Sequence, residues 1–420
     1  MHKTTRLVGL LGALTIVIGA CSGSASPTPA PASVAPASTA PASIAPATPA
    51  PSAGLSGKLT IWQSYGSSGG NAEFKAFSRI VEQVKAANPG LQIDVLEVPF
   101  DQLFKKFETE SAAGGGPDMF IAPNDSMGNE SRMGILAVLD GKIDDVVANS
   151  TQVSVDTSKV GGVLYQVPES LKAVEMYYDS AVVKTPPTTT DELMAYVKAN
   201  PGKVGIIAPS EYFNWGWYSA FGGKIFDDTG KCAATANSGV ADAMKFVKDL
   251  KAAGAFVDAD YGKVNDAFKS GKIDIMFNGN WTLGDYRNAR PALAIAPMPS
   301  GPGGTAGPLV GVDGWYINSA SPNQDLAIAV AKEMVSQSAQ TIYVDVAGHV
   351  PANKNIVIID PLVKSFGDAF ATAFPRPQTA EFNNYWAAFG NAWKEVMDKG
   401  TDPATAVAAA CATLDAANKK

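Results

Sequence analysis

The stretch from Lys58 to Pro123 alternates between two apolar periodicities, and this alternation constrains the fold more than any other feature of the chain. Apolar residues at 91, 93 and 95 alternate with other positions, as on a half-buried strand. Between 74 and 84 they recur at helical spacing, before Asn88, Pro89 and Gly90 stop the pattern. The predicted order is a strand at 58–64, a helix from 71, a strand at 91–99, a helix at 102–115 capped by Asp101, and a strand at 117–123. This β-α-β-α-β order predicts an α/β fold with a mainly parallel sheet and helices on both faces.

A second α/β unit and a largely helical C-terminal part are expected further along the chain. Residues 162–180 form a loop and an extended segment rich in aromatic and β-branched residues. Apolar spacing predicts helices at 188–200, 238–254, 263–271, 322–338, 383–400 and 403–420.

The first 57 residues are not expected to fold as a domain. Residues 1–20 carry Lys3 and Arg6 before an uncharged apolar run too short for a confident membrane span, which predicts a secretory signal peptide. The sequence "IGAC" then resembles a bacterial lipobox, which implies that Cys21 is lipidated; ordinary cleavage beside an incidental cysteine is the alternative. Residues 21–57 form an uncharged Ala/Pro/Ser tract that cannot bury a core, so we expect a semi-extended tether.

Charge and histidine content exclude several classes of function. Lys3 and Arg6 leave with the signal, so 33 basic residues fall to 31 against 40 acidic ones, which argues against nucleic-acid binding. His349 is then the only histidine, so a multi-histidine metal site cannot be built. A Ser-His-Asp triad would depend on His349, and the chain has no GxSxG elbow to meet it. We expect His349 to be a loop or packing residue, and we expect neither a metal nor a cofactor.

Cys232 and Cys411 are the two cysteines of the globular part. In an exported protein, a disulfide between them is the simplest expectation. Their wide separation in sequence leaves two free thiols as the alternative.

Four sequence blocks resemble those of a single family. They are "GPDMFIAPND", "LYQVPESLKAVEMYYDS", "FKSGKIDIMFNGNWTLGDY" and "VGVDGWYINSASPNQDLA". With the later "NYWAAF", they follow the order and rough spacing of the sugar-binding family of bacterial extracellular solute-binding proteins. The chain is similar to the maltose and maltodextrin binders of ABC importers over most of residues 58–415.

The resemblance implies two α/β lobes joined by hinge segments, with the ligand in the cleft between them. The N-terminal lobe would be 58–171 plus about 297–356, and the C-terminal lobe 172–296 plus about 357–420. The expected protein is a monomer and not an enzyme. It closes around a sugar, an α-glucoside such as maltose, maltodextrin or trehalose, and delivers it to the permease and ATPase subunits of an importer. The protein is expected to lie outside the cytoplasm and to be anchored to the cell membrane by a lipid.

The same resemblance assigns site residues. Asp125 falls where the maltose binders have a carboxylate that bonds sugar hydroxyls, while Ala122 stands where they have a stacking tryptophan. Their other stacking aromatics are matched by Tyr212, Trp215, Trp281 and Trp386. Their interlobe carboxylate is matched by either Glu169 or Glu175, with Lys172 nearby.

Further candidates come from the residues themselves. A sugar presents C–H faces that suit aromatic rings and a rim of hydroxyls that needs polar partners. The stretch "SEYFNWGWYSAFGG" (210–223) has glycines and Asn214 that indicate loop or helix-start geometry, so part of its ring surface is expected to face the cleft. Tyr212, Trp215 and Trp217 are expected at the ligand, and Phe213, Tyr218 and Phe221 in the core. Strand positions add Tyr65, Asp313 and Trp315 to the candidates.

Two other functions stay open. The same fold could bind another solute, such as a phosphorylated polyol or a polyamine. Alternatively, Asp125 and Glu169 could form the carboxylate pair of a lipid-anchored glycoside hydrolase.

Overall fold

The computed structural model describes residues 54–66, 71–370 and 373–420. The predicted signal peptide, Cys21 and nearly all of the predicted tether lie outside the described residues. The described part falls within one compact unit, Ala53–Lys420, which is built on two large sheets and also contains a small two-stranded one. The first strand begins at Ser56, two residues before the predicted one, so Ser56 and Gly57 pair with the neighbouring strand rather than ending the tether.

The first sheet has the strand order β13-β6-β12-β3-β1-β2, with β14 beside β12. Its strands are β1 (Ser56–Gln63), β2 (Gly90–Glu97), β3 (Met119–Pro123), β6 (Val167–Lys172), β12 (Leu309–Ile317), β13 (Val350–Pro351) and β14 (Phe374–Pro375). As predicted, β1 runs parallel to β2 and β3, whereas β12 is antiparallel to β3 and to β6. The carboxyl end of β3 therefore lies beside the middle of β12.

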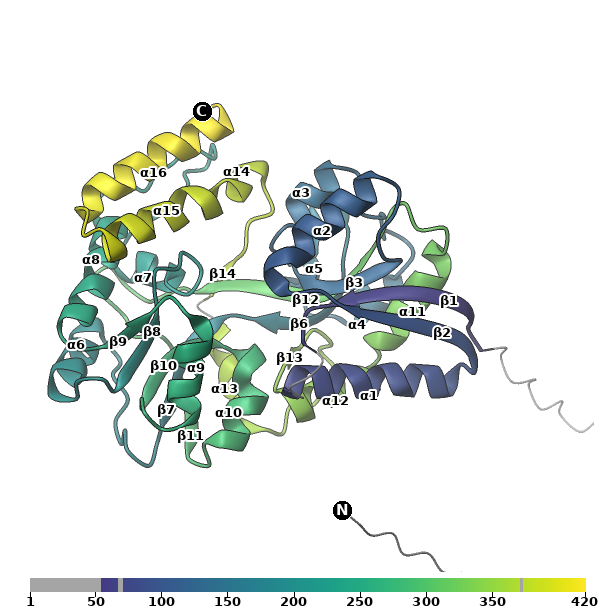
Figure 1. Ribbon diagram of the computed structural model, residues 1–420, viewed down its shortest axis with the longest axis horizontal. Coiled ribbons are helices and arrows are strands. Elements are labelled where there is room, and N and C mark those ends of the chain that lie inside the picture. The colour runs from purple at the N-terminus through teal and green to yellow at the C-terminus, as the bar shows by residue number, and fades with distance from the viewer. Residues whose placement is uncertain (1–53, 67–70, 371–372) are drawn as a thin grey trace, which may run out of the picture. The chain divides into compact units, whose positions relative to one another are not determined.

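Three longer helices accompany this sheet (Figure 1): α1 (Ala72–Ala87), α2 (Phe100–Ala112) and α11 (Gln324–Met334). The helical face predicted for α1 is buried in the core at Phe77, Ile80 and Val84. Asp101 does not cap α2, because the helix begins at Phe100, two residues before the predicted start, with Pro99 at the cap position. It lies in the first turn, where a carboxylate is favoured by the helix dipole.

The second sheet has the order β11-β7-β10-β8-β9. Its strands are β7 (Val174–Asp179), β8 (Val204–Ile207), β9 (Phe256–Asp258), β10 (Ile275–Gly279) and β11 (Leu293–Ala296). Its longer helices are α6 (Thr190–Ala199), α8 (Gly239–Ala252), α9 (Tyr261–Lys269) and α10 (Leu283–Ala289). The C-terminal helices α15 (Tyr385–Asp398) and α16 (Pro403–Asn418) pack against each other and against α8 (Figure 1).

The chain passes between the two sheets at three places. Only Ala173 separates β6 of the first sheet from β7 of the second, and the chain returns between β11 and β12. After α13 (Pro361–Ala369), β14 pairs with β12, and the chain then continues into α14 (Ala380–Asn383) beside α15. Side chains on β6, β12 and the segment after β14 are therefore placed where the two sheets meet.

The remaining elements are short. They are α3 (Met127–Arg132), α4 (Asp144–Asn149), α5 (Gln152–Thr157), β4 (Lys159–Val160), β5 (Val163–Leu164), α7 (Trp215–Ala220), η1 (Asn280–Thr282), α12 (Gln337–Ile342) and the π-helical turn η2 (Tyr343–Ala347). Within the residues that the structure describes, no helix has the length and apolar character needed to cross a membrane.

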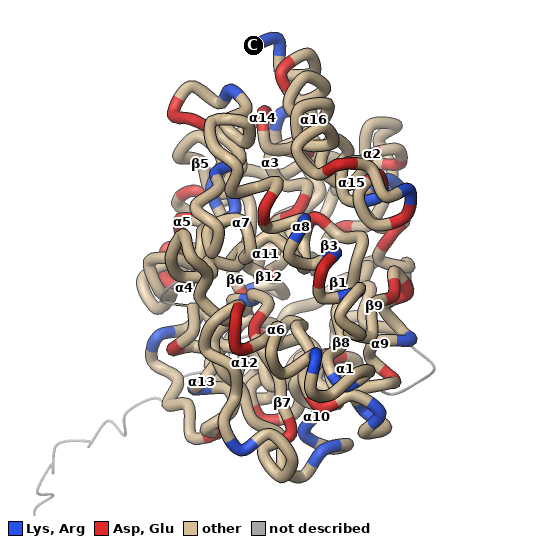
Figure 2. Tube along the Cα trace, turned by 90° about the vertical axis from the view of Figure 1, so that its left-hand side faces the viewer, with Lys and Arg blue, Asp and Glu red and all other residues tan. Residues whose placement is uncertain are grey.

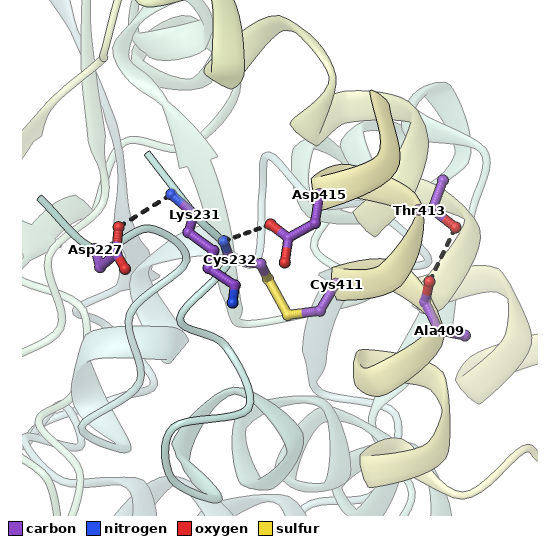
Figure 3. The surroundings of a disulfide bond; sticks show 7 residues. All are labelled: Asp227, Lys231, Cys232, Ala409, Cys411, Thr413 and Asp415. Atoms are coloured by element: carbon purple, nitrogen blue, oxygen red, sulfur yellow. Dashed lines mark hydrogen bonds between the residues drawn. A yellow bond between two sulfur atoms is a disulfide. The ribbon is translucent and has the colours of Figure 1, made fainter. Parts of the chain in front are cut away.

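A disulfide joins Cys232 and Cys411, with their Cα atoms 5.3 Å apart (Figure 3). Cys411 lies on α16, and Cys232 lies in the loop that precedes α8. The backbone N–H of Cys232 also donates a 2.8 Å hydrogen bond to Asp415 Oδ1, one turn along α16 (Figure 3). The bond thus fastens the last helix to a loop 179 residues earlier in the chain.

Candidate functional site

Three aromatic side chains meet where strands of the second sheet end. Tyr212 lies in the loop after β8, Trp281 follows β10 directly, and Trp386 lies at the start of α15. The ring centroid of Tyr212 is 6.0 Å from that of Trp281 and 6.4 Å from that of Trp386. All three side chains are half-buried. We call these three residues the ring cluster; all three were predicted as ligand-contacting residues, and the structure brings them together.

The position of Trp281 is set by its neighbours. Its indole Nε1 donates a 2.9 Å hydrogen bond to the hydroxyl of Tyr261 on α9. A Cβ at Gly279 would lie 1.8 Å from ring atom Cζ3 of Trp281, so only glycine leaves room for the ring against the end of β10. The sequence "NGNW" therefore presents this ring at the carboxyl end of the strand.

An ion pair lies against the ring cluster. The guanidinium of Arg376, from the segment after β14, pairs with the carboxylate of Asp125, from the loop after β3. Its Cζ lies 5.3 Å from the ring centroid of Tyr212 and 5.8 Å from that of Trp386. The predicted carboxylate is thus at the rings, but it is neutralised by an arginine that the sequence analysis did not single out.

A second ion pair lies between the crossing strands. Lys172 Nζ, at the end of β6, is 2.7 Å from Asp313 Oδ1 on β12. The same ammonium group lies 5.3 Å from the ring centroid of Trp281. Both side chains are largely buried. Asp313 therefore lies near the ring cluster through its ion pair with Lys172, and its contact with a ligand stays a prediction.

Glu169 does not lie free at the site. It is fully buried, and its Oε2 accepts a 2.7 Å hydrogen bond from Ser170 Oγ and lies 3.1 Å from His349 Nδ1. The other ring nitrogen of His349 lies 3.0 Å from Glu73 Oε1 on α1. Glu169 was expected to contact a ligand, but in this structure an internal network of side chains already satisfies its oxygens.

His349 was expected to be a loop or packing residue. In the structure it is the positively charged partner of the two buried carboxylates, Glu169 and Glu73. Burial alone would lower its pKa, but the carboxylates of Glu169 and Glu73 outweigh that effect and raise the pKa to about 10. The ring of Tyr343 stacks on the imidazole with centroids 4.8 Å apart. The imidazolium thus holds α1 to β6 beside the point where β6 leads into the second sheet.

Tyr65 and Glu175, which were also expected at the ligand, lie outside the ring cluster. The ring of Tyr65 packs on Phe77 and Tyr343, with centroids 5.9 and 6.3 Å away, so it belongs beside the histidine network rather than in the ring cluster. Glu175 is buried in β7, where its Oε2 accepts a 2.9 Å bond from the backbone N–H of Met298. Burial raises its pKa to about 8.

Three of the tryptophans predicted at the ligand are core residues instead. Trp217 is 1% exposed and meets Phe246 and Phe277 edge-on, because α7 turns it toward α8. Trp215 is buried against Tyr385 and other rings of the second-lobe core. Trp315 lies fully buried in the first-lobe core, where the register of β12 shifts between Asp313 and Gly314. The residue that this shift leaves without a partner is Glu169 of β6, since Asp313 lies opposite Ser170 and Gly314 lies opposite Pro168.

A cavity of about 420 Å³ adjoins the Asp125–Arg376 pair. Its lining includes Asp125, Arg132 and Asn383 beside the ring of Trp386. In Figure 2, acidic and basic positions are interspersed along the described chain. Across the described ranges, no group of three or more His, Cys, Asp or Glu side chains could hold a metal ion.

Two α/β units that are joined by crossing segments, with rings and charged side chains gathered at strand ends where they meet, define a two-lobed binding protein. Residues 79–371 match the family described as bacterial extracellular solute-binding protein, and the chain belongs to this family. The predicted family and two-lobed α/β fold are confirmed.

Two named relatives and a solved structure are similar to this chain over most of its length. The maltotriose-binding protein of Pyrococcus abyssi is 28% identical over 362 residues, which cover 81% of this chain and 78% of that protein. The galactooligosaccharide-binding protein of Bacillus subtilis is 25% identical, over 86% of this chain and 90% of its own. The structure of the Thermus thermophilus maltotriose binding protein bound with maltotriose matches with a TM-score of 0.78 and 27% identity, over 86% of this chain and 100% of that chain.

Proposed function

We propose that this protein captures an oligosaccharide of the α-glucoside type, such as maltose, a maltodextrin or trehalose, between its two lobes and delivers it to an ABC importer. The observation that carries the proposal is the ring cluster with Asp125 and Asp313 beside it. Half-buried aromatic faces suit the C–H faces of a sugar ring, and carboxylates accept hydrogen bonds from its hydroxyls. The ligand would lie over Tyr212, Trp281 and Trp386.

The relatives support the class of ligand. The proteins named above bind maltotriose or galactooligosaccharide, and two of them cover over four-fifths of this chain. Maltotriose is also the ligand in the similar solved structure. The fold would close by bending at the crossing segments, with lobes at 58–171 plus about 297–356 and at 172–296 plus about 357–420.

The structure gives no support to the glycoside hydrolase alternative. That reaction needs two carboxyl groups that both face the scissile bond. Asp125 pairs with Arg376, and Glu169 is fully buried in bonds to Ser170 and His349. Both carboxylates are thus engaged by other side chains of the protein, and only Asp125 lies beside the ring cluster.

We also propose that Cys21 carries a lipid anchor, which would hold the protein at the membrane while it captures the sugar. Cys21→Ser should leave the protein soluble after cell fractionation without changing its affinity for sugar. Continued recovery of this variant in the membrane fraction would contradict lipidation at Cys21.

Calorimetry of the purified protein tests the ligand. The panel contains maltose, maltotriose, trehalose and a galactooligosaccharide, with spermidine and glycerol 3-phosphate as charged alternatives. Binding of one α-glucoside series would support the proposal, and ligand at about 100 times its dissociation constant should add about 2.7 kcal/mol to stability. A response to a charged solute alone would overturn the choice of ligand while keeping the fold.

A further inference from the structure

Arg376 occupies an unusual position for a cation. The residue is 3% exposed, and its guanidinium lies against the rings of both Tyr212 and Trp386. A planar guanidinium stacks on aromatic faces as a flat ligand does. The surface that the proposed function gives to a sugar is therefore covered, at two of its three rings, by a side chain of the same protein.

The contacts of Arg376 come from both sides of the site. The two rings belong to elements next to the second sheet, whereas Asp125 and Asn124 belong to the loop after β3 of the first sheet. Arg376 Nη1 donates a 3.3 Å hydrogen bond to Asn124 Oδ1 in addition to its ion pair with Asp125. Two residues later, the side-chain amide of Gln378 donates a 2.9 Å bond to the backbone carbonyl of Asn124. Arg376 thus bridges the parts that a ligand would have to bridge.

The guanidinium is held but not fully satisfied in this position. Its Nε has no hydrogen-bond partner among the described residues, although it is buried. Burial lowers the pKa of the Arg376 guanidinium to about 9, which reflects the cost of keeping this charge away from water. A group held at such a cost is easier to displace than one with a complete set of partners.

The guanidinium is closely packed on one side, while two of its partners border open space. Gly311 on β12 lies close against it, since a Cβ there would be 3.2 Å from Arg376 Cζ. The cavity of about 420 Å³ is lined by Asp125, its ion-pair partner, and by Trp386, one of the two rings that it covers. Arg376 could therefore leave the rings while its charge stays close to Asp125.

We propose that Arg376 is a displaceable internal occupant of the ring cluster, whose guanidinium covers Tyr212 and Trp386 in the empty protein and leaves these ring faces when a sugar binds. This inference rests on the proposed function. Arg376 is then a residue that sets affinity through competition: the apparent dissociation constant is the intrinsic one divided by the fraction of protein with uncovered rings. Removal of the guanidinium raises that fraction and tightens binding.

The test compares maltotriose binding by the wild type, Arg376→Ala and Arg376→Met, measured by calorimetry on the full chain. The Met variant keeps an apolar side chain in the buried position, so the test can still be made if the Ala variant does not fold. Both variants should bind roughly threefold to tenfold more tightly than the wild type, because the competing occupant is gone. Arg287→Ala is the matched control: it removes a half-buried arginine that pairs with Asp360, outside the ring cluster, and should leave affinity unchanged.

The outcomes separate this inference from the proposed function. Weaker or equal binding by both Arg376 variants, with normal binding by the wild type, would show that the guanidinium is a ligand of the sugar or a bystander, and would overturn the inference alone. Failure of the wild type to bind any sugar would overturn both. As a second measurement, the Nε–H resonance of Arg376, assigned by its loss in Arg376→Met, should move away from its ring-current position on addition of maltotriose; an unmoved resonance would contradict displacement.

Discussion

Trp281 and Tyr261 are joined by a 2.9 Å hydrogen bond in which the indole Nε1 donates to the tyrosine hydroxyl. Tyr261 is itself held in place, since its ring stacks on Phe213 with centroids 5.7 Å apart. The bond fixes the plane of the Trp281 ring before any ligand arrives. A side chain that is ordered in advance loses less entropy on binding, which strengthens its contribution to affinity.

Trp281→Ala should weaken maltotriose binding by about 2 kcal/mol or more, the cost typical of truncating an anchor residue. Calorimetry on folded protein gives the measurement. Tyr261→Phe keeps both rings and removes the hydroxyl that accepts the indole hydrogen bond, so a smaller loss is expected. Unchanged affinity in Trp281→Ala together with a lower melting temperature would assign Trp281 to the core.

Trp217→Ala should have the opposite pattern. Its ring fills the space between Phe246 and Phe277, so truncation should lower the free energy of unfolding by about 3–5 kcal/mol. Affinity of the protein that remains folded should not change. Urea unfolding and calorimetry measure the two quantities, with Trp217→Phe as a milder control. A marked loss of affinity at full stability would return Trp217 to the binding site.

His349 should make stability depend on pH in the alkaline range. The carboxylates of Glu169 and Glu73 raise its pKa from the ordinary 6.5 to about 10 in the folded protein. The folded state therefore binds the proton more tightly, and this contribution is fully present below pH 6.5 and is lost as pH rises through about 10. His349→Gln should remove it, so the difference in unfolding free energy between wild type and variant should shrink as pH rises through this window.

Urea unfolding at a series of pH values measures that difference. Glu73→Gln removes one of the two facing carboxylates and should reduce the same pH dependence without abolishing it. A difference between wild type and His349→Gln that stays constant from pH 6 to pH 10 would contradict a charged imidazole in this network.

Loss of the disulfide should lower stability without affecting the site. A cross-link between Cys232 and Cys411 restricts the unfolded chain over 179 positions, and such bonds typically contribute about 2–4 kcal/mol. Reduction with dithiothreitol should lower the unfolding free energy by this amount and leave sugar affinity unchanged. The double variant Cys232→Ser, Cys411→Ser should already have the lower stability and should not respond to dithiothreitol; equal responses in both proteins would contradict the bond.

The fold could be predicted largely because its elements carry clear periodicities. The strand–helix alternation through β3 and the apolar faces of α8, α15 and α16 are local properties of the chain, and sequence blocks identify the family. The position of Trp281 at the end of a strand could be predicted because the sequence before it is a buried apolar strand. The direction of the Trp217 ring could not be predicted. A shift of two residues along a helix decides whether a ring faces α8 or the site, and the residue types alone do not show which way it faces.

The charged partners of the site depend on distant parts of the chain. Glu73 and His349 meet across 276 positions, and Arg376 reaches Asp125 only after the chain has crossed between the sheets for the last time. No local pattern in "FPRPQT" or "AGHVPANK" indicates these pairs. The one available indication of Arg376 was its place between two prolines, in the segment before Trp386, which was predicted to contact the ligand.

Strand β12 also limits when during synthesis the fold can be completed. It lies between β6 and β3 in the first sheet, although it is formed by residues 309–317. A nascent chain that has reached only Ser300 lacks the strand that joins β6 to β3, and it lacks α15 and α16 over the second lobe. We expect such a truncated chain to be degraded by protease under conditions in which the full-length protein survives. Nearly the whole chain must therefore be synthesised before either lobe can close its core, so the precursor stays unfolded for most of the time of translation.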